Sequence, residues 1–121
     1  FKKKKISLNK VLILGISYKK NVNDDRESPS YVLINLLKKE KIFFDYFDPY
    51  FKELKKGRNN QTSKRRIILN DQNISKYDCS IIMTDHDKFD YKKILKNSKF
   101  LFDTRGVFKK MKISSNKIIY C

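Results

Sequence analysis

A continuous apolar run, Val11-Leu12-Ile13-Leu14-Gly15, is the first regular element that the sequence predicts. A strand buried on both faces has this pattern, and such strands are typical of parallel sheets. Polar residues 16–27 follow and predict a loop. Ser28-Pro29 then predicts a helix start, with serine as the N-cap and proline in the first helical position. We therefore expect a strand–loop–helix unit whose loop, from Gly15 to Pro29, forms a ligand site.

Outward from this unit, apolar runs continue to alternate with helical patterns. Further strands are expected at Ile42–Phe47, Arg66–Leu69, Cys79–Met83, Phe100–Asp103 and, at a sheet edge, Ile118–Tyr120. Short helical segments are expected at 51–56, 73–76 and 91–95.

This alternation predicts an α/β fold: a doubly wound, mainly parallel sheet of about five to six strands with helices on both faces. We assign the domain to residues 10–121 and a basic linker end to residues 1–9. In such sheets ligands bind beyond the carboxyl ends of the strands, near the switch in strand order. That rule selects the loop after Gly15, Asp48-Pro49, Thr84–Asp87 and Thr104-Arg105.

The chain is strongly basic, with 29 Lys and Arg against 13 Asp and Glu and a net charge of +16. Such an excess favours phosphorylated or polyanionic partners. Most of the basic residues are lysine, however, and Asn and Ile are also abundant, so a compositional bias explains the charge more simply. Aromatic residues between lysines would suit base stacking, but most fall where a core face needs them, so nucleic acid is not the expected partner.

The two cysteines, Cys79 and Cys121, form no CxxC pair, which favours a reducing compartment and argues against a disulfide scaffold. No apolar run approaches the roughly 18 residues that would span a bilayer. The basic start has no apolar segment of a secretory signal after it. We expect a cytoplasmic protein without a membrane partner, and the lack of an initiator Met suggests a fragment.

Two positions suit an anionic ligand. Lys19 and Lys20 stand near the expected helix N-terminus, where point charges and free N–H groups favour anions; the alternative is an exposed lysine pair. Arg105 follows a buried strand and should emerge on the same sheet edge, where a guanidinium can hold a phosphate through two donors. Its alternatives are a surface arginine or a salt bridge to Asp103.

Other chemistry-bearing residues are expected to be structural. Asp85, His86, Asp87 and Asp90 could be drawn as a metal cluster, but consecutive side chains rarely converge on one ion, and no metal is expected. Asp87 or Asp90 should instead cap the following helix, with His86 half exposed. Cys79 lies within an apolar strand and should be a buried, inert thiol.

Four stretches together resemble a known family. Gly15–Pro29 follows the pattern G-x-[AS]-[FY]-K-x-x-x-x-D-x-R-E-S-P, and Asp45–Tyr50, Cys79–Asp90 and Phe102–Arg105 follow in matching order. This is similar to the C-terminal, UDP-binding domain of the UDP-glucose/GDP-mannose dehydrogenase family, over about residues 10–106. The wording of the first and third stretches is most similar to the UDP-N-acetylglucosamine 6-dehydrogenase branch.

The resemblance implies a domain that grips the UDP part of a UDP-sugar. Full-length members carry an N-terminal NAD-binding domain and a central dimerisation region, which would be the partners of this domain. They oxidise the C6 alcohol of the sugar to a carboxylate, with NAD as cofactor and a catalytic cysteine thiolate. By motif position Tyr18, Lys19 and Arg105 would bind substrate, with Lys20 a secondary candidate and no catalytic residue in the chain.

Some features depart from the family pattern. Asn23 replaces a frequent acid, and Gly106 stands where Asn is common. The NAD-binding glycine motif and the catalytic cysteine segment are absent, so we expect the isolated chain to produce no NADH. Two alternatives stay open: a non-catalytic regulatory or interaction domain of the same fold, and a basic nucleic-acid-binding domain.

Overall fold

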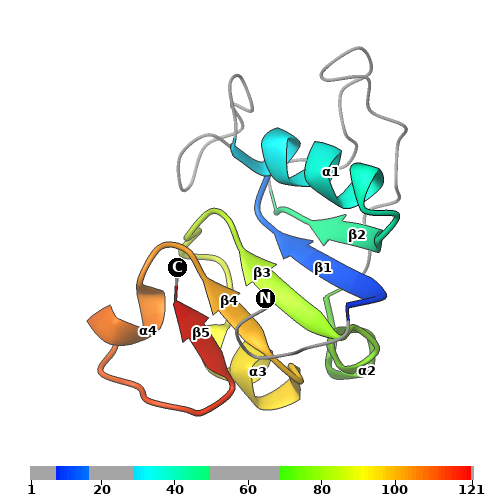
Figure 1. The fold of residues 1–121 in the computed structure, drawn as a ribbon. Helices are drawn as coiled ribbons and strands as arrows, with labels where there is room; N and C mark the ends of the chain where they lie inside the picture. The colour runs from blue at the N-terminus through cyan, green and yellow to red at the C-terminus, as the bar shows by residue number, and fades with distance from the viewer. Residues whose placement is uncertain (1–7, 17–28, 50–68, 121) are drawn as a thin grey trace.

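The computed structural model describes residues 8–16, 29–49 and 69–120, which form a five-stranded sheet with four helices (Figure 1). In chain order the elements are β1 (Lys10–Leu14), α1 (Pro29–Lys39), β2 (Phe43–Phe47), α2 (Asp71–Ser75), β3 (Cys79–Ile82), α3 (Tyr91–Asn97), β4 (Leu101–Asp103), α4 (Val107–Lys110) and β5 (Ile118–Tyr120).

The sheet is entirely parallel, in the order β2-β1-β3-β4-β5, with β5 at an edge as predicted. The register aligns the strand ends, because Leu14 pairs with both Phe47 and Ile82, and Ile82 pairs with Asp103. The residues that follow these strands therefore lie together beyond the carboxyl ends of the strands, a region that we call the carboxyl edge. The strand order reverses between β1 and β3, and this is the switch point where ligands bind in such folds.

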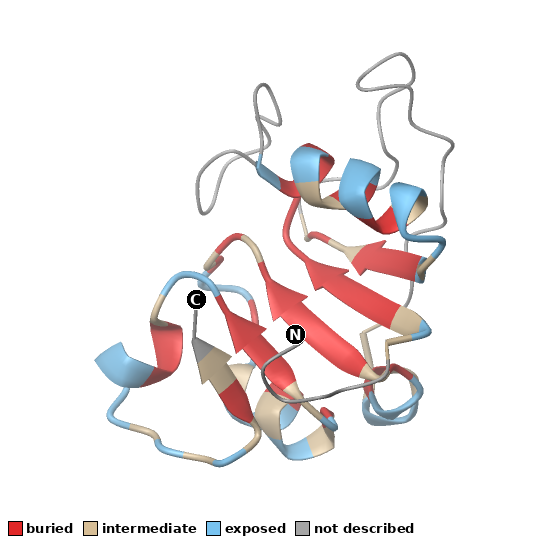
Figure 2. Ribbon diagram, viewed as in Figure 1, coloured by how far each residue is buried: buried red, intermediate tan, exposed pale blue. Residues whose placement is uncertain are grey.

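The core has two layers, one on each face of the sheet. Val11 and Ile13 of β1 pack with α1, whereas Leu12 and Leu14 pack with residues of α2, α3 and α4. Burial on both faces explains the continuous apolar run of β1, and Figure 2 shows the same burial along β1, β3 and β4. The doubly wound α/β prediction is confirmed, with five strands rather than six among the described residues.

The helix boundaries follow local rules. α1 begins at Pro29 and α3 is N-capped by Asp90, both as predicted. The turn expected at 73–76 is a short helix that begins earlier, after the N-cap Asn70. α4 was not predicted; it follows Gly106, which has a left-handed backbone with φ of 69°.

Two of the expected helices and strands fall wholly or partly on residues outside the described ranges. The helix expected at 51–56 lies outside them, as do residues 66–68 of the strand expected at Arg66–Leu69. Leu69 itself is described and is not in a strand, so among the described residues no strand stands between β2 and β3 in chain order.

The amino ends of the strands, which we call the amino edge, have their own polar contacts. The Asp78 carboxylate accepts hydrogen bonds from the backbone N–H groups of Asn9, at 2.8 Å, and Lys10, at 3.0 Å. Nearby, the Tyr77 hydroxyl donates to Asp45 Oδ2 at 2.6 Å within the buried layer. The two Asp78 bonds lie at the far ends of the strands from the carboxyl edge, whereas the Tyr77 bond reaches Asp45 in the middle of β2.

Candidate functional site

The carboxyl edge begins with Gly15, whose backbone no other residue would adopt without strain. Its φ is +103°, and its N–H donates to the Phe47 carbonyl at 2.9 Å. A Cβ at this position would lie 2.6 Å from Thr84 Cβ and 2.7 Å from Thr84 N. The glycine therefore lets the turn after β1 press against the turn after β3 at the switch point.

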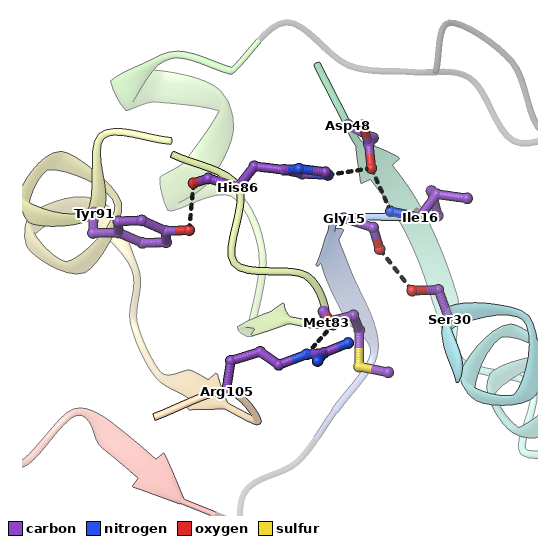
Figure 3. A network of polar contacts seen from close by, with 8 residues as sticks. All are labelled: Gly15, Ile16, Ser30, Asp48, Met83, His86, Tyr91 and Arg105. Atoms are coloured by element: carbon purple, nitrogen blue, oxygen red, sulfur yellow. Dashed lines mark hydrogen bonds and ion pairs between the residues drawn. The ribbon is translucent and has the colours of Figure 1, made fainter. Parts of the chain in front are cut away.

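Residues 17–28 connect two described ends, and each end is held by a buried hydrogen bond. The Ile16 N–H donates to Asp48 Oδ2 at 2.7 Å, and the Ser30 hydroxyl donates to the Gly15 carbonyl at 2.6 Å (Figure 3). The first bond ties the turn after β1 to the turn after β2. The second ties the first turn of α1 to the end of β1, so both ends of the segment meet beside Gly15.

Asp48 also contacts His86, with 2.9 Å between Oδ2 and Nε2 (Figure 3). Both side chains are 0% exposed. An ionised Asp48 only accepts hydrogen bonds, so this contact then requires the His86 tautomer with a proton on Nε2. The expectation that His86 is half exposed is wrong, because the ring turns inward to Asp48 and packs on Phe89, with 5.5 Å between ring centroids.

Tyr91 holds the backbone of the same turn. Its hydroxyl donates to the His86 carbonyl at 2.6 Å. Burial raises the pKa of the Tyr91 phenol well above its ordinary value, and the carboxylates of Asp85, Asp87 and Asp103 raise it further. The phenol therefore keeps the proton that it donates to His86 throughout the neutral and mildly alkaline range.

We expect the Tyr91→Phe variant and the wild type to have equal phenolate absorbance up to about pH 10, where ordinary tyrosines titrate, and to diverge only above it. The folded-state pKa is raised, so the Tyr91 contribution to stability is complete below the unfolded pKa and is lost as pH rises through the folded one. The substitution should lower the free energy of unfolding at neutral pH by about 1 kcal/mol. A lower phenolate absorbance in the variant than in the wild type below pH 10 would contradict the raised pKa of Tyr91.

Arg105 lies at the end of β4, exposed at the carboxyl edge as predicted. Its backbone N–H donates to Asp103 Oδ1 at 3.1 Å, and the other carboxylate oxygen accepts from Phe108 N at 3.0 Å. The Arg105 Nε donates to the Met83 carbonyl at 2.9 Å (Figure 3). Within residues 8–16, 29–49 and 69–120 nothing pairs with its two terminal nitrogens, so the salt bridge to Asp103 considered from the sequence does not form.

The other residues selected from the sequence have separate outcomes. Tyr18, Lys19 and Lys20 lie outside the described residues. Cys79 is buried in β3, as expected. In the described ranges, His, Cys, Asp and Glu side chains do not gather in a group of three that could hold a metal ion.

The residues that organise the carboxyl edge were only partly visible in the sequence. The sequence places Asp48-Pro49 at this edge but gives Asp48 no specific contact, and Ser30 is not singled out. A signal was available for the first: the stretches containing Asp48 and His86 both follow strands and therefore share an edge. Nothing comparable pointed to Met83, because a backbone carbonyl has no sequence signature.

Comparison with known proteins identifies relatives of this arrangement. Residues 12–110 match the model of the UDP-glucose/GDP-mannose dehydrogenase family, UDP binding domain. A UDP-N-acetyl-D-mannosamine dehydrogenase of Methanococcus maripaludis is 35% identical over 107 residues, covering 81% of this chain and 23% of the relative. The solved UDP-N-acetyl-mannosamine dehydrogenase of S. aureus superposes with a TM-score of 0.67 at 27% identity, covering 97% of this chain and 27% of that one.

A second solved structure, the UDP-D-ManNAc dehydrogenase of Pyrococcus horikoshii, has a TM-score of 0.67 at 21% identity and supports the fold alone. It covers 96% of this chain and 25% of that one. The chain thus spans about a quarter of the length of the relatives it matches. The names of these relatives specify N-acetylmannosamine. The N-acetylglucosamine branch, which we inferred from the wording of two sequence motifs, therefore stays a prediction. None of the helices in the described part of the chain has the length and apolar character needed to cross a bilayer.

Proposed function

Because the chain belongs to the UDP-glucose/GDP-mannose dehydrogenase family and carries its UDP-binding domain, we propose that it binds the UDP portion of a UDP-sugar at the carboxyl edge. The observation that carries the proposal is Arg105, exposed beside the switch point with Nε held by Met83. Its terminal nitrogens suit the diphosphate, because a guanidinium bonds phosphate oxygens through two parallel donors. Tyr18 and Lys19 complete the proposed site, with Lys20 as a secondary member.

We further propose that the chain acts within a longer NAD-dependent dehydrogenase that oxidises the sugar C6 alcohol to a carboxylate. The chain has only three glycines, at positions 15, 57 and 106, which cannot form a G-x-G-x-x-G dinucleotide motif. The residues present therefore do not fit NAD. We assign NAD binding, the catalytic cysteine and dimerisation to the remainder of such an enzyme, since the relatives are about four times as long.

Titration calorimetry with UDP tests the site. We expect Lys19→Ala and Arg105→Ala each to weaken UDP binding by about tenfold or more, because hydrogen bonds to charged groups are worth about 1.5–3 kcal/mol. The matched control is Lys39→Ala, which removes an exposed charge from the last turn of α1 and should leave the affinity unchanged.

The same variants separate the alternatives. A regulatory domain that has lost the ligand would bind no UDP. A nucleic-acid-binding domain would bind an oligonucleotide with a steep salt dependence and would be indifferent to Lys19 and Arg105. Either result would contradict the proposed UDP site.

A further inference from the structure

The pair formed by Asp48 and His86 is an unusual feature of the core. Both side chains are fully buried, and a hydrogen-bonded buried polar pair is seldom more stabilising than apolar residues of the same size. The distinguishing property of the pair is geometric: Asp48 and His86 must keep one distance and orientation for their hydrogen bond to persist. A buried polar pair of this kind is therefore better explained by the positions that it fixes than by the stability that it adds.

His86 is fixed from three directions. Its Nε2 bonds Asp48, its ring packs against Phe89, and its carbonyl accepts the Tyr91 hydroxyl at 2.6 Å. Phe89 in turn contacts Phe47 at the end of β2, with 6.0 Å between ring centroids. The turn after β3 is thus anchored to the end of β2 by a polar and an aromatic contact.

Two groups at the switch point depend on this anchor. On one side, Asp48 holds the Ile16 N–H, the last described group before the segment that carries Lys19. On the other side, Met83 belongs to the same turn as His86, and its carbonyl holds Arg105 Nε. Figure 3 shows the pair next to the Ile16 contact, whereas the contact of Met83 with Arg105 lies at the other end of the turn after β3.

We propose that His86 is a positioning residue of the nucleotide site: through Asp48 and through the turn that contains Met83, it sets the placement of Ile16 and Arg105. The proposal rests on the proposed function, since it concerns the same UDP site. His86 itself is 0% exposed, so it acts without touching the ligand.

UDP affinity of the full 121-residue chain, measured by titration calorimetry, tests the proposal in three variants. His86→Leu removes the ring donor, whereas His86→Gln keeps a side-chain N–H and should recover part of the affinity. The matched control is Tyr77→Phe, which deletes a buried hydrogen bond from Tyr77, two residues before β3, to Asp45 in the middle of β2. Residues that orient metal ligands typically change metal affinity by about 10- to 100-fold when they are substituted. By analogy, we expect His86→Leu to weaken UDP binding by about tenfold. Tyr77→Phe should lower stability and leave UDP binding within about twofold of wild type.

A double-mutant cycle with Arg105→Ala then separates positioning from a general loss of structure. If His86 acts partly through Arg105, the effect of His86→Leu should be at least about threefold smaller in the Arg105→Ala background. Wild-type affinity in His86→Leu, strict additivity in the cycle, or an equal loss in Tyr77→Phe would overturn the proposal. If His86→Leu does not fold, His86→Gln carries the cycle: we expect a smaller loss of UDP affinity, and its strict additivity with Arg105→Ala would overturn the proposal. Failure of the wild-type chain to bind UDP would instead contradict the proposed function itself.

Discussion

Replacing Gly15 with alanine is expected to lower the free energy of unfolding by about 3 kcal/mol or more. Two penalties combine at this position. A φ of +103° is strained for any residue with a Cβ, and the new methyl group would lie 2.6 Å from Thr84 Cβ and 2.7 Å from Thr84 N. The second contact is with backbone, so relief requires β1 and β3 to separate at the switch point. Urea denaturation followed by circular dichroism measures the loss.

Gly106→Ala is the matched control for this prediction. Gly106 also has a positive φ, of +69°, but a Cβ there would meet nothing within 4 Å. Only the backbone penalty remains, so the expected loss is about 1 kcal/mol. Equal losses in the two variants would show that the contact between Gly15 and Thr84 is unimportant.

Asp48→Ala is expected to lower the free energy of unfolding by about 2–5 kcal/mol, because each buried donor left without an acceptor costs about 1–3 kcal/mol. Two such donors are the Ile16 N–H and His86 Nε2, which both bond Asp48 Oδ2. Asp48→Asn retains an oxygen that can accept both bonds and should lose about half as much or less. Chemical denaturation of the three proteins checks the order, and an alanine variant as stable as the asparagine variant would refute it.

The fold was largely predictable because its central strands β1, β3 and β4 are buried on both faces. Runs such as Val11–Leu14 and Cys79–Ile82 contain no alternation and match the positions of β1 and β3. Capping chemistry limited the start of α3 to Asp87 or Asp90, and Asp90 is the N-cap. The exception, α4, spans only Val107–Lys110 and is too short for a helical period to be seen. Leu69 was misassigned because the short apolar run Ile67-Ile68-Leu69 does not by itself distinguish a strand from a loop.

The candidate site was predictable in its location and not in its internal contacts. The rule for doubly wound sheets correctly placed Arg105 at the carboxyl edge. The burial of His86 was missed because the stretch Thr84–Asp87 is polar. The partner of His86, Asp48, lies 38 residues earlier in the chain. A long-range hydrogen bond between two polar stretches leaves no periodic pattern, and the contact of Arg105 with a backbone carbonyl leaves none either.

Mapping UDP on the chain by NMR tests the central claim most directly, since it shows where the nucleotide binds without any substitution. The account predicts that added UDP shifts the backbone amide signals of Ile16, Met83 and Arg105 at the carboxyl edge. The signals of Lys10 and Asp78 at the amino edge should not move. Shifts confined to the amino edge, or none at saturating UDP, would contradict a UDP site at the switch point.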